Sequence, residues 1–206
     1  MAHELSAARL FLQDLVAHAP LEQTDREIGR EEVARLEKLL ARLRRSRRSE
    51  EARAEQPLLP VVQRALGRVA LLQHKRLRVA VDVPAGTQVR AGPRGLEMLL
   101  VCLLRRAAEG TAEGGGLALR VEAAAPGLLL DVEEQGPGLG EALPGSAFHP
   151  LDLLACGGPG LDLLVAMGVA RAQGWRLSWL RVDGRTVFRL ALPASDCVSL
   201  PERRAA

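Results

Sequence analysis

The sequence has few aromatic residues and no strong excess of charge of either sign. Aromatic residues make up 2% of the 206 residues and tyrosine is absent, whereas apolar residues reach 48%. Leucine, alanine and valine must therefore fill the core, and the aromatic platforms on which nucleic-acid bases stack are scarce. The formal net charge is only +3, from 28 basic and 25 acidic residues. This balance argues against a nucleic-acid-binding protein.

Cysteine is also scarce, and long apolar runs are absent. Cys102, Cys156 and Cys197 lie far apart and form no C-x-x-C pair, so we expect neither a metal centre nor a redox motif. An odd number of cysteines in a cysteine-poor chain favours a reducing compartment. No apolar run reaches the ~18 residues of a membrane span, and the N-terminus lacks a signal-peptide pattern. The sequence predicts a cytoplasmic protein without a membrane segment.

Over the first fifty residues, apolar side chains recur at helical spacing. In the first segment these apolar residues, three or four positions apart, are Leu5, Ala8, Leu12, Leu15 and Ala19. In the second segment they are Val33, Leu36, Leu40 and Leu43. Two helices with one apolar seam each cannot bury the seams alone. We therefore expect a homodimer in which two hairpins, residues 1–50, form a four-helix bundle. Packing of the hairpin on its own C-terminal domain is the alternative.

A charged stretch without periodicity, residues 46–56, separates this hairpin from a second domain at residues 57–194. Its apolar pattern changes repeatedly between helical and strand spacing. The expected helices are 58–74, 93–109 and 160–172, and the expected strands are 77–83, 117–122, 128–133, 176–182 and 186–192. The Asp183-Gly184 pair favours a hairpin turn. The fold class predicted is α+β, with helices on one face of a mixed sheet, and residues 195–206 are expected to form a loose tail.

Two glycine-rich stretches lie at the edges of these expected elements. Residues 134–139 (EQGPGL) follow a strand directly, and residues 157–161 (GGPGL) precede a helix directly. Glycine lets the backbone approach a ligand closely, and a helix N-terminus offers free N–H groups to phosphate. Each stretch on its own also fits an ordinary turn.

In order and surroundings, these stretches resemble the two glycine boxes of GHKL-type ATPases. Residues 93–110 resemble the N-box helix of that family, Phe148-His149-Pro150 resembles the Phe-x-Pro before its lid, and Ala2-His3-Glu4-Leu5 resembles an H box. Nearly the whole chain is thus similar to a sensor-histidine-kinase core. The resemblance implies a dimerisation and phosphotransfer hairpin followed by a Bergerat-type α/β sandwich, acting in two-component signal transduction.

The departures from the family pattern fall on the nucleotide site. Cys102 and Arg106 stand where the N box carries asparagines, and neither supplies the oxygen ligands that magnesium requires. Glu134 replaces the aspartate that holds the adenine amino group, and Asp162 replaces a glycine at the expected phosphate-facing helix start, where a carboxylate repels phosphate. The remaining nucleotide-site positions that match the family are Gly136, Gly138, Gly158 and Gly160.

These departures predict a weak nucleotide site. Loss of one charged hydrogen bond costs roughly 1.5–3 kcal/mol. With the lost metal bridge and the added repulsion, a total near ~4 kcal/mol corresponds to about a thousandfold in affinity. We therefore expect no cofactor, with at most weak binding of ATP and magnesium, and loss of autokinase activity.

The hairpin keeps residues that match the phosphotransfer chemistry of the family. The resemblance makes His3 the phospho-acceptor, since imidazole is nucleophilic near neutral pH, and makes Glu4 the neighbouring proton acceptor. A frayed terminus is the alternative for His3. Helical spacing places Ala7, Leu10, Phe11 and Asp14 on or beside the face of His3, where receiver domains dock in the family. Packing of Leu10 and Phe11 on the C-terminal domain is the alternative there.

The leading hypothesis is a dimeric histidine phosphotransferase or pseudokinase in a phosphorelay. It would pass phosphoryl groups between response-regulator receiver domains through His3 without using ATP. Two alternatives stay open. One is a divergent sensor histidine kinase that binds ATP in an unusual way, and the other is a non-catalytic regulator that binds a kinase or a receiver.

Overall fold

The computed structural model describes residues 53–136 and 158–201. The chain divides into two compact units, Met1–Ser49 and Glu50–Ala206. The hairpin expected over residues 1–50 lies outside the described residues, so its helices and its dimer seam stay predictions. The second unit is described by itself below.

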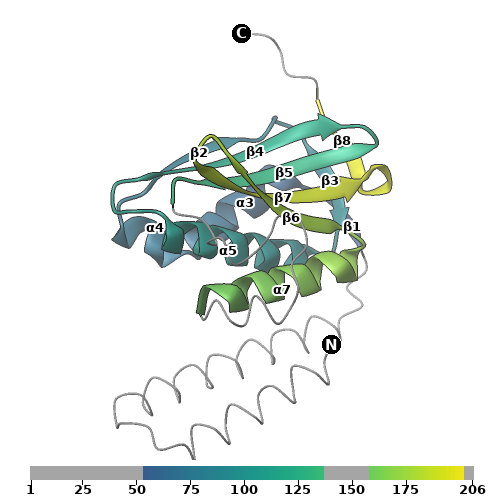
Figure 1. Ribbon diagram of the computed structural model, residues 1–206. Coiled ribbons are helices and arrows are strands. Elements are labelled where there is room, and N and C mark those ends of the chain that lie inside the picture. The colour runs from purple at the N-terminus through teal and green to yellow at the C-terminus, as the bar shows by residue number, and fades with distance from the viewer. Residues whose placement is uncertain (1–52, 137–157, 202–206) are drawn as a thin grey trace, which may run out of the picture. The chain divides into compact units, whose positions relative to one another are not determined.

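A five-stranded mixed sheet forms the centre of the second unit (Figure 1). Its strand order is β2-β4-β5-β7-β6, in which β2 and β4 are parallel and every other pair is antiparallel. The strands are β2 (Arg78–Asp82), β4 (Gly116–Ala124), β5 (Gly127–Glu134), β6 (Arg176–Val182) and β7 (Arg185–Pro193). Strands β6 and β7 meet across Asp183 and Gly184, whose φ angles are 49° and 76°. The predicted hairpin turn is confirmed, because both residues have the positive φ of a type I′ turn.

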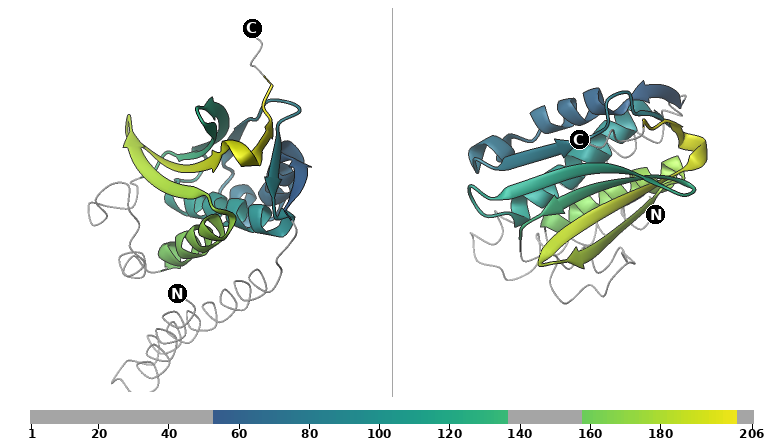
Figure 2. Two further views of the ribbon diagram at one scale, coloured as in Figure 1. Left: turned by 90° about the vertical axis from the view of Figure 1, so that its right-hand side faces the viewer. Right: turned by 90° about the horizontal axis from the view of Figure 1, so that it is seen from above.

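The helices cover one face of this sheet (Figures 1 and 2). They are α3 (Leu58–Gly67), α4 (Ala70–His74), α5 (Pro93–Gly110) and α7 (Gly158–Gln173). Helix α5 packs against α3, α4, α7 and β5, and buries leucines at helical spacing, which are Leu96, Leu99, Leu100, Leu103 and Leu104. Among these helices, none has the length and apolar character to cross a membrane. The predicted fold class, an α+β sandwich with helices on one face of a mixed sheet, is confirmed.

One expectation about the local structure was wrong, and one feature was missed. The single helix expected over residues 58–74 is two helices, because α3 ends at Gly67, a weak helix former, and α4 begins at Ala70. A second sheet, which the sequence did not predict, joins β1 (Ala54–Pro57), β3 (Gln88–Ala91) and β8 (Cys197–Ser199) in the order β1-β3-β8. Strands of three or four residues are too short to show a clear alternation.

The tail expected to be loose is instead attached at its start. Residues Ala194–Asp196 form a 3₁₀ turn that leads into β8. The Asp196 carboxylate, only 2% exposed, accepts a hydrogen bond of 2.7 Å from the Trp175 indole N–H and another from Arg53. The buried carboxylate fixes the polypeptide after β7 to the end of α7. The expectation of a loose tail was therefore wrong for residues 195–199.

Candidate functional site

The C-terminal end of α5 and the C-terminal end of β5 meet in the second unit. Lys75 holds this end of α5, because its Nζ donates to the carbonyl oxygens of Ala108, Glu109 and Thr111 at 3.0, 3.0 and 2.9 Å. These are carbonyl groups that the end of a helix leaves without partners inside the helix. Two of the predicted nucleotide-site residues, Cys102 and Arg106, lie on α5 and are buried.

The structure brings Arg106 directly to Glu134, the last residue of β5. Their side chains form an ion pair in which Nη1 of Arg106 lies 3.6 Å from Oε2 of Glu134. Arg106 is 5% exposed and Glu134 is fully buried. The guanidinium also lies over the Phe188 ring, 5.9 Å from its centroid, a distance at which a cation is attracted to the ring face. Arg106 of the N box and Glu134 of the first glycine box, which the sequence showed as separate departures from the family pattern, therefore form one ion pair.

Burial dominates the electrostatics of this pair. Burial raises the pKa of Glu134 above its ordinary value of 4.5, and the positive charge of Arg106 opposes that rise without cancelling it. The charged carboxylate is thus costly in this position unless Arg106 stays beside it.

Two glycines allow the close approach of these elements. A Cβ on Gly110 would fall against the Glu134 carboxylate and 2.8 Å from Nη1 of Arg106. A Cβ on Gly136 would fall on the carbonyl oxygen of Gly110. Gly136 was predicted to permit close approach to a nucleotide, but the group that it approaches here is the end of α5. Gly110 was not recognised from the sequence, where it reads as an ordinary glycine at a helix end.

A second arginine of α5, Arg105, faces Asp162, the acidic residue that replaces a family glycine in α7. Asp162 is fully buried, and its Oδ1 lies 3.5 Å from Nη1 of Arg105. Asp162 is the fifth residue of α7, beyond the first turn. In this position Asp162 faces α5, and the repulsion of phosphate expected from its carboxylate stays a prediction. Arg105 and Arg106 thus each balance one acidic residue of the glycine-box segments.

No family model matches the chain. In sequence, the chain is 26% identical to the sensory histidine kinase/phosphatase NtrB of Escherichia coli O157:H7 over 213 residues, covering 94% of this chain and 60% of NtrB. It is 31% identical to the C4-dicarboxylate transport sensor protein DctS of Rhodobacter capsulatus over 103 residues, covering 48% of this chain and 16% of DctS. The chain therefore spans less than two thirds of the length of these curated relatives.

Solved structures of histidine kinases share the fold. The histidine kinase AdeS of Acinetobacter baumannii matches with a TM-score of 0.60 at 17% identity, covering 94% of this chain and 95% of AdeS. The catalytic domain of the histidine kinase ThkA matches with a TM-score of 0.56 at 16% identity, covering 69% of this chain and 97% of that domain. This chain is histidine-kinase-like. Its described domain has the GHKL-type sandwich of a histidine-kinase catalytic domain.

Three residues at the family's nucleotide-site positions differ in chemistry from the family pattern. At the N-box positions, Cys102 offers a thiol and Arg106 a cation, and neither is a ligand for magnesium. The carboxylate of Glu134 is fully buried and forms an ion pair with Arg106.

Several predicted site residues cannot be placed. The phospho-acceptor candidate His3, its neighbour Glu4 and the predicted receiver-docking residues Ala7, Leu10, Phe11 and Asp14 lie outside the described residues, as does Gly138. Gly158 is the first residue of α7, and Gly160 lies in its first turn. The structure thus brings Arg106, Glu134 and Gly136 together and leaves the phosphotransfer residues as predictions.

Proposed function

We propose that this protein is a two-component signalling protein that passes phosphoryl groups without using ATP, as a histidine phosphotransferase of the pseudokinase type. Similarity to sensor histidine kinases supports the signalling context, which includes receiver domains as partners and a homodimer through the hairpin. The ion pair between Arg106 and Glu134 is the observation that carries the loss of ATP use.

The energetic argument concerns what a nucleotide would have to displace. For Glu134 to accept a hydrogen bond from adenine, its carboxylate must leave Arg106. Breaking a buried ion pair by removing one partner costs roughly 3–5 kcal/mol. That cost corresponds to about two to four orders of magnitude in affinity. A magnesium ion would in addition meet the positive charge of Arg106 rather than an oxygen ligand.

The phosphotransfer itself would use His3. In the forward direction, a nitrogen of the His3 imidazole attacks the phosphorus of a receiver phospho-aspartate. The N–P bond forms, the O–P bond to the aspartate breaks, and the receiver recovers its carboxylate. The imidazole loses its N–H proton, for which the neighbouring Glu4 is the acceptor. The reverse sequence returns the phosphoryl group to a receiver.

The test uses the full chain in two measurements. The first is a calorimetric titration with a non-hydrolysable ATP analogue and magnesium, in which we expect no binding up to millimolar ligand. In the second, a receiver domain carrying labelled phospho-aspartate is mixed with the protein. We expect label on the wild type and on His18→Ala, a control for a second histidine of the hairpin, but none on His3→Ala. Micromolar nucleotide binding together with labelling of His3 from ATP would refute the proposal.

A divergent kinase is the second candidate, because the backbone of the glycine boxes is partly kept. Glu134 keeps a carboxylate, the glycines Gly136, Gly138, Gly158 and Gly160 remain, and the sequence and fold similarities fit an active kinase equally well. A variant with Cys102→Asn, Arg106→Asn, Glu134→Asp and Asp162→Gly restores the family residues. We expect it to bind the ATP analogue at least tenfold more tightly than the wild type. Equal, tight binding by both proteins would favour the divergent kinase.

A further inference from the structure

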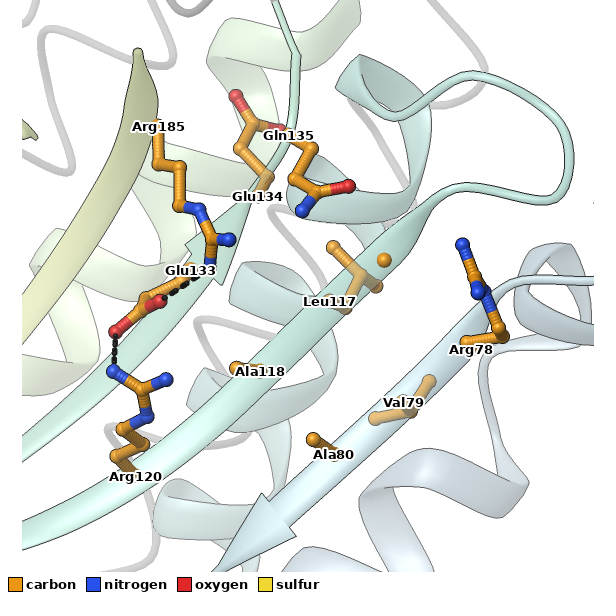
Figure 3. A pocket seen from close by; sticks show the side chains of 11 residues that line it. Arg78, Val79, Ala80, Leu117, Ala118, Arg120, Glu133, Glu134, Gln135 and Arg185 are labelled. Carbon is orange, nitrogen blue, oxygen red and sulfur yellow. Dashed lines mark hydrogen bonds and ion pairs between the residues drawn. The ribbon is translucent and has the colours of Figure 1, made fainter. Parts of the chain in front are cut away.

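A pocket of about 450 Å³ opens on the five-stranded sheet near the starts of β2 and β4 (Figure 3). Its floor is formed by small residues on neighbouring strands. Ala80 pairs with Ala118, and Gly116 pairs with Arg78, so these four positions lie on two adjacent strands at neighbouring levels. Alanine and glycine are poor strand formers, and here they leave a hollow between longer side chains. Glycine within a strand often marks a place where a ligand or another backbone approaches closely.

The side chains around this hollow are mainly cationic. On one side, Arg120 and Arg185 both reach Glu133, at 2.7 and 3.5 Å, and each arginine side chain stays 45% exposed. Arg78 stands on the other side (Figure 3). It is exposed, and within the described part of the chain no ion pair of Arg78 is present. Three guanidinium groups therefore face the opening with one partly buried carboxylate, that of Glu133, since the carboxylate of Glu134 is fully buried.

The three arginines favour an anionic binding partner, and the open shape of the pocket favours a macromolecule over a small molecule. Guanidinium groups bind carboxylates through paired N–H donors. Small-molecule sites bury most of the ligand surface, whereas this pocket lies open on a sheet face. A partner that gains contacts outside the pocket is therefore the better match. The nucleic-acid alternative lacks support, because none of the residues that line the pocket is aromatic and could stack on a base.

We propose that this pocket is a docking site for an acidic segment of a partner protein. A glutamate or aspartate of that segment pairs with Arg78, and a second acidic side chain pairs with Arg120 and Arg185 beside Glu133. The small floor lets the partner backbone lie close to β4. The Gln135 side chain, whose Oε1 is 3.3 Å from where a Cβ on Gly116 would be, is placed to hydrogen-bond that backbone. Glu134 also lines the pocket, but its carboxylate is buried and paired with Arg106. The proposal therefore does not use this carboxylate, and it does not depend on the proposed phosphotransfer.

The test measures binding of a fluorescently labelled eight-residue peptide with four glutamates to the full-length protein by fluorescence anisotropy. The same peptide with glutamine in place of glutamate is the neutral probe. Arg78→Glu removes a cation from the pocket. Arg176→Glu is the matched control, because it makes the same charge change at an exposed position of β6, on the opposite edge of the sheet. Ala118→Leu fills the floor without changing any charge.

We expect the acidic peptide to bind and the neutral peptide not to bind. Arg78→Glu and Ala118→Leu should each weaken binding at least tenfold, and Arg176→Glu less than twofold, with circular dichroism confirming that all variants are folded. Equal losses in Arg78→Glu and Arg176→Glu would show a general charge effect and overturn the proposal. Displacement of the peptide by low-millimolar inorganic phosphate at constant ionic strength would also overturn it, because the site would then bind small anions.

Discussion

Arg106 and Glu134 face each other across the junction of α5 and β5, with 3.6 Å between Nη1 and Oε2. The family pattern places an asparagine and an aspartate at these two positions, both for nucleotide binding. In this chain the two side chains bind each other. Both side chains are buried, so the energetic effect of changing one of them depends on the charge of the other. This mutual dependence can be measured.

Replacing the two residues singly and together should reveal their coupling. Arg106→Met leaves the Glu134 carboxylate buried without its cation, which costs roughly 3–5 kcal/mol of unfolding free energy. Glu134→Gln should cost less, since burial already disfavours the charged carboxylate. In the double variant, much of the cost of Arg106→Met should disappear, because no buried charge remains. Urea denaturation of the four proteins gives the coupling free energy. Additivity within about 0.5 kcal/mol would contradict the pairing.

Gly110 should be intolerant of even one added methyl group. Its Cβ would fall against the Glu134 carboxylate and Arg106 Nη1, so Gly110→Ala must push the pair apart and should destabilise the fold by roughly 1–3 kcal/mol. Gly67→Ala is the matched control at the end of α3, where a Cβ meets nothing within 4 Å. It should be neutral or stabilising. Adding Glu134→Asp, whose side chain is one methylene shorter, should relieve most of the Gly110→Ala cost in thermal denaturation. Equal effects of the two alanine variants would disprove the predicted clash.

The pH dependence of stability should report the burial of Glu134. Its pKa is raised above 4.5 in the folded protein, so the folded state binds the proton more tightly than the unfolded state does. The corresponding stability is fully present below about pH 4.5 and is lost as the pH rises through the raised pKa. Relative to Glu134→Gln, which cannot titrate, the wild type should therefore lose stability from pH 4 to pH 8. A wild type that gains stability over this range, relative to the glutamine variant, would mean that attraction to Arg106 outweighs burial.

The long elements of this fold could be predicted from the sequence. Helix α5 has eighteen residues with a clear apolar stripe, and the strands β4, β5, β6 and β7 have seven to nine residues each, long enough to show an apolar pattern. Strands β1, β3 and β8 were missed. They have three or four residues each, and their stability comes from partners that are distant in sequence, which local periodicity does not reveal.

The candidate site was predictable in its residues but not in its geometry. Motif positions identified Cys102, Arg106 and Glu134 as departures from the nucleotide-binding pattern. That Arg106 would pair with Glu134, and Arg105 with Asp162, depends on the packing of α5 against β5 and α7. No sequence pattern reports such contacts between elements. Gly110 was missed for the same reason. A side chain at this position would collide with Glu134, which lies twenty-four residues further along the chain.

The segment after β7 should be required for stability, contrary to a loose tail. Ending the chain after Pro193 removes Asp196, which accepts a 2.7 Å hydrogen bond from the Trp175 indole, and removes β8. The buried indole N–H and Arg53 then lose their charged acceptor, a change that alone costs roughly 1.5–3 kcal/mol. Ending the chain after Pro201 is the control and should leave the unfolding free energy unchanged within about 0.5 kcal/mol. Asp196→Ala in the full-length chain should reproduce most of the cost of the shorter chain. If the chain that ends at Pro193 is as stable in urea as the control, the Trp175–Asp196 hydrogen bond does not hold this segment to α7.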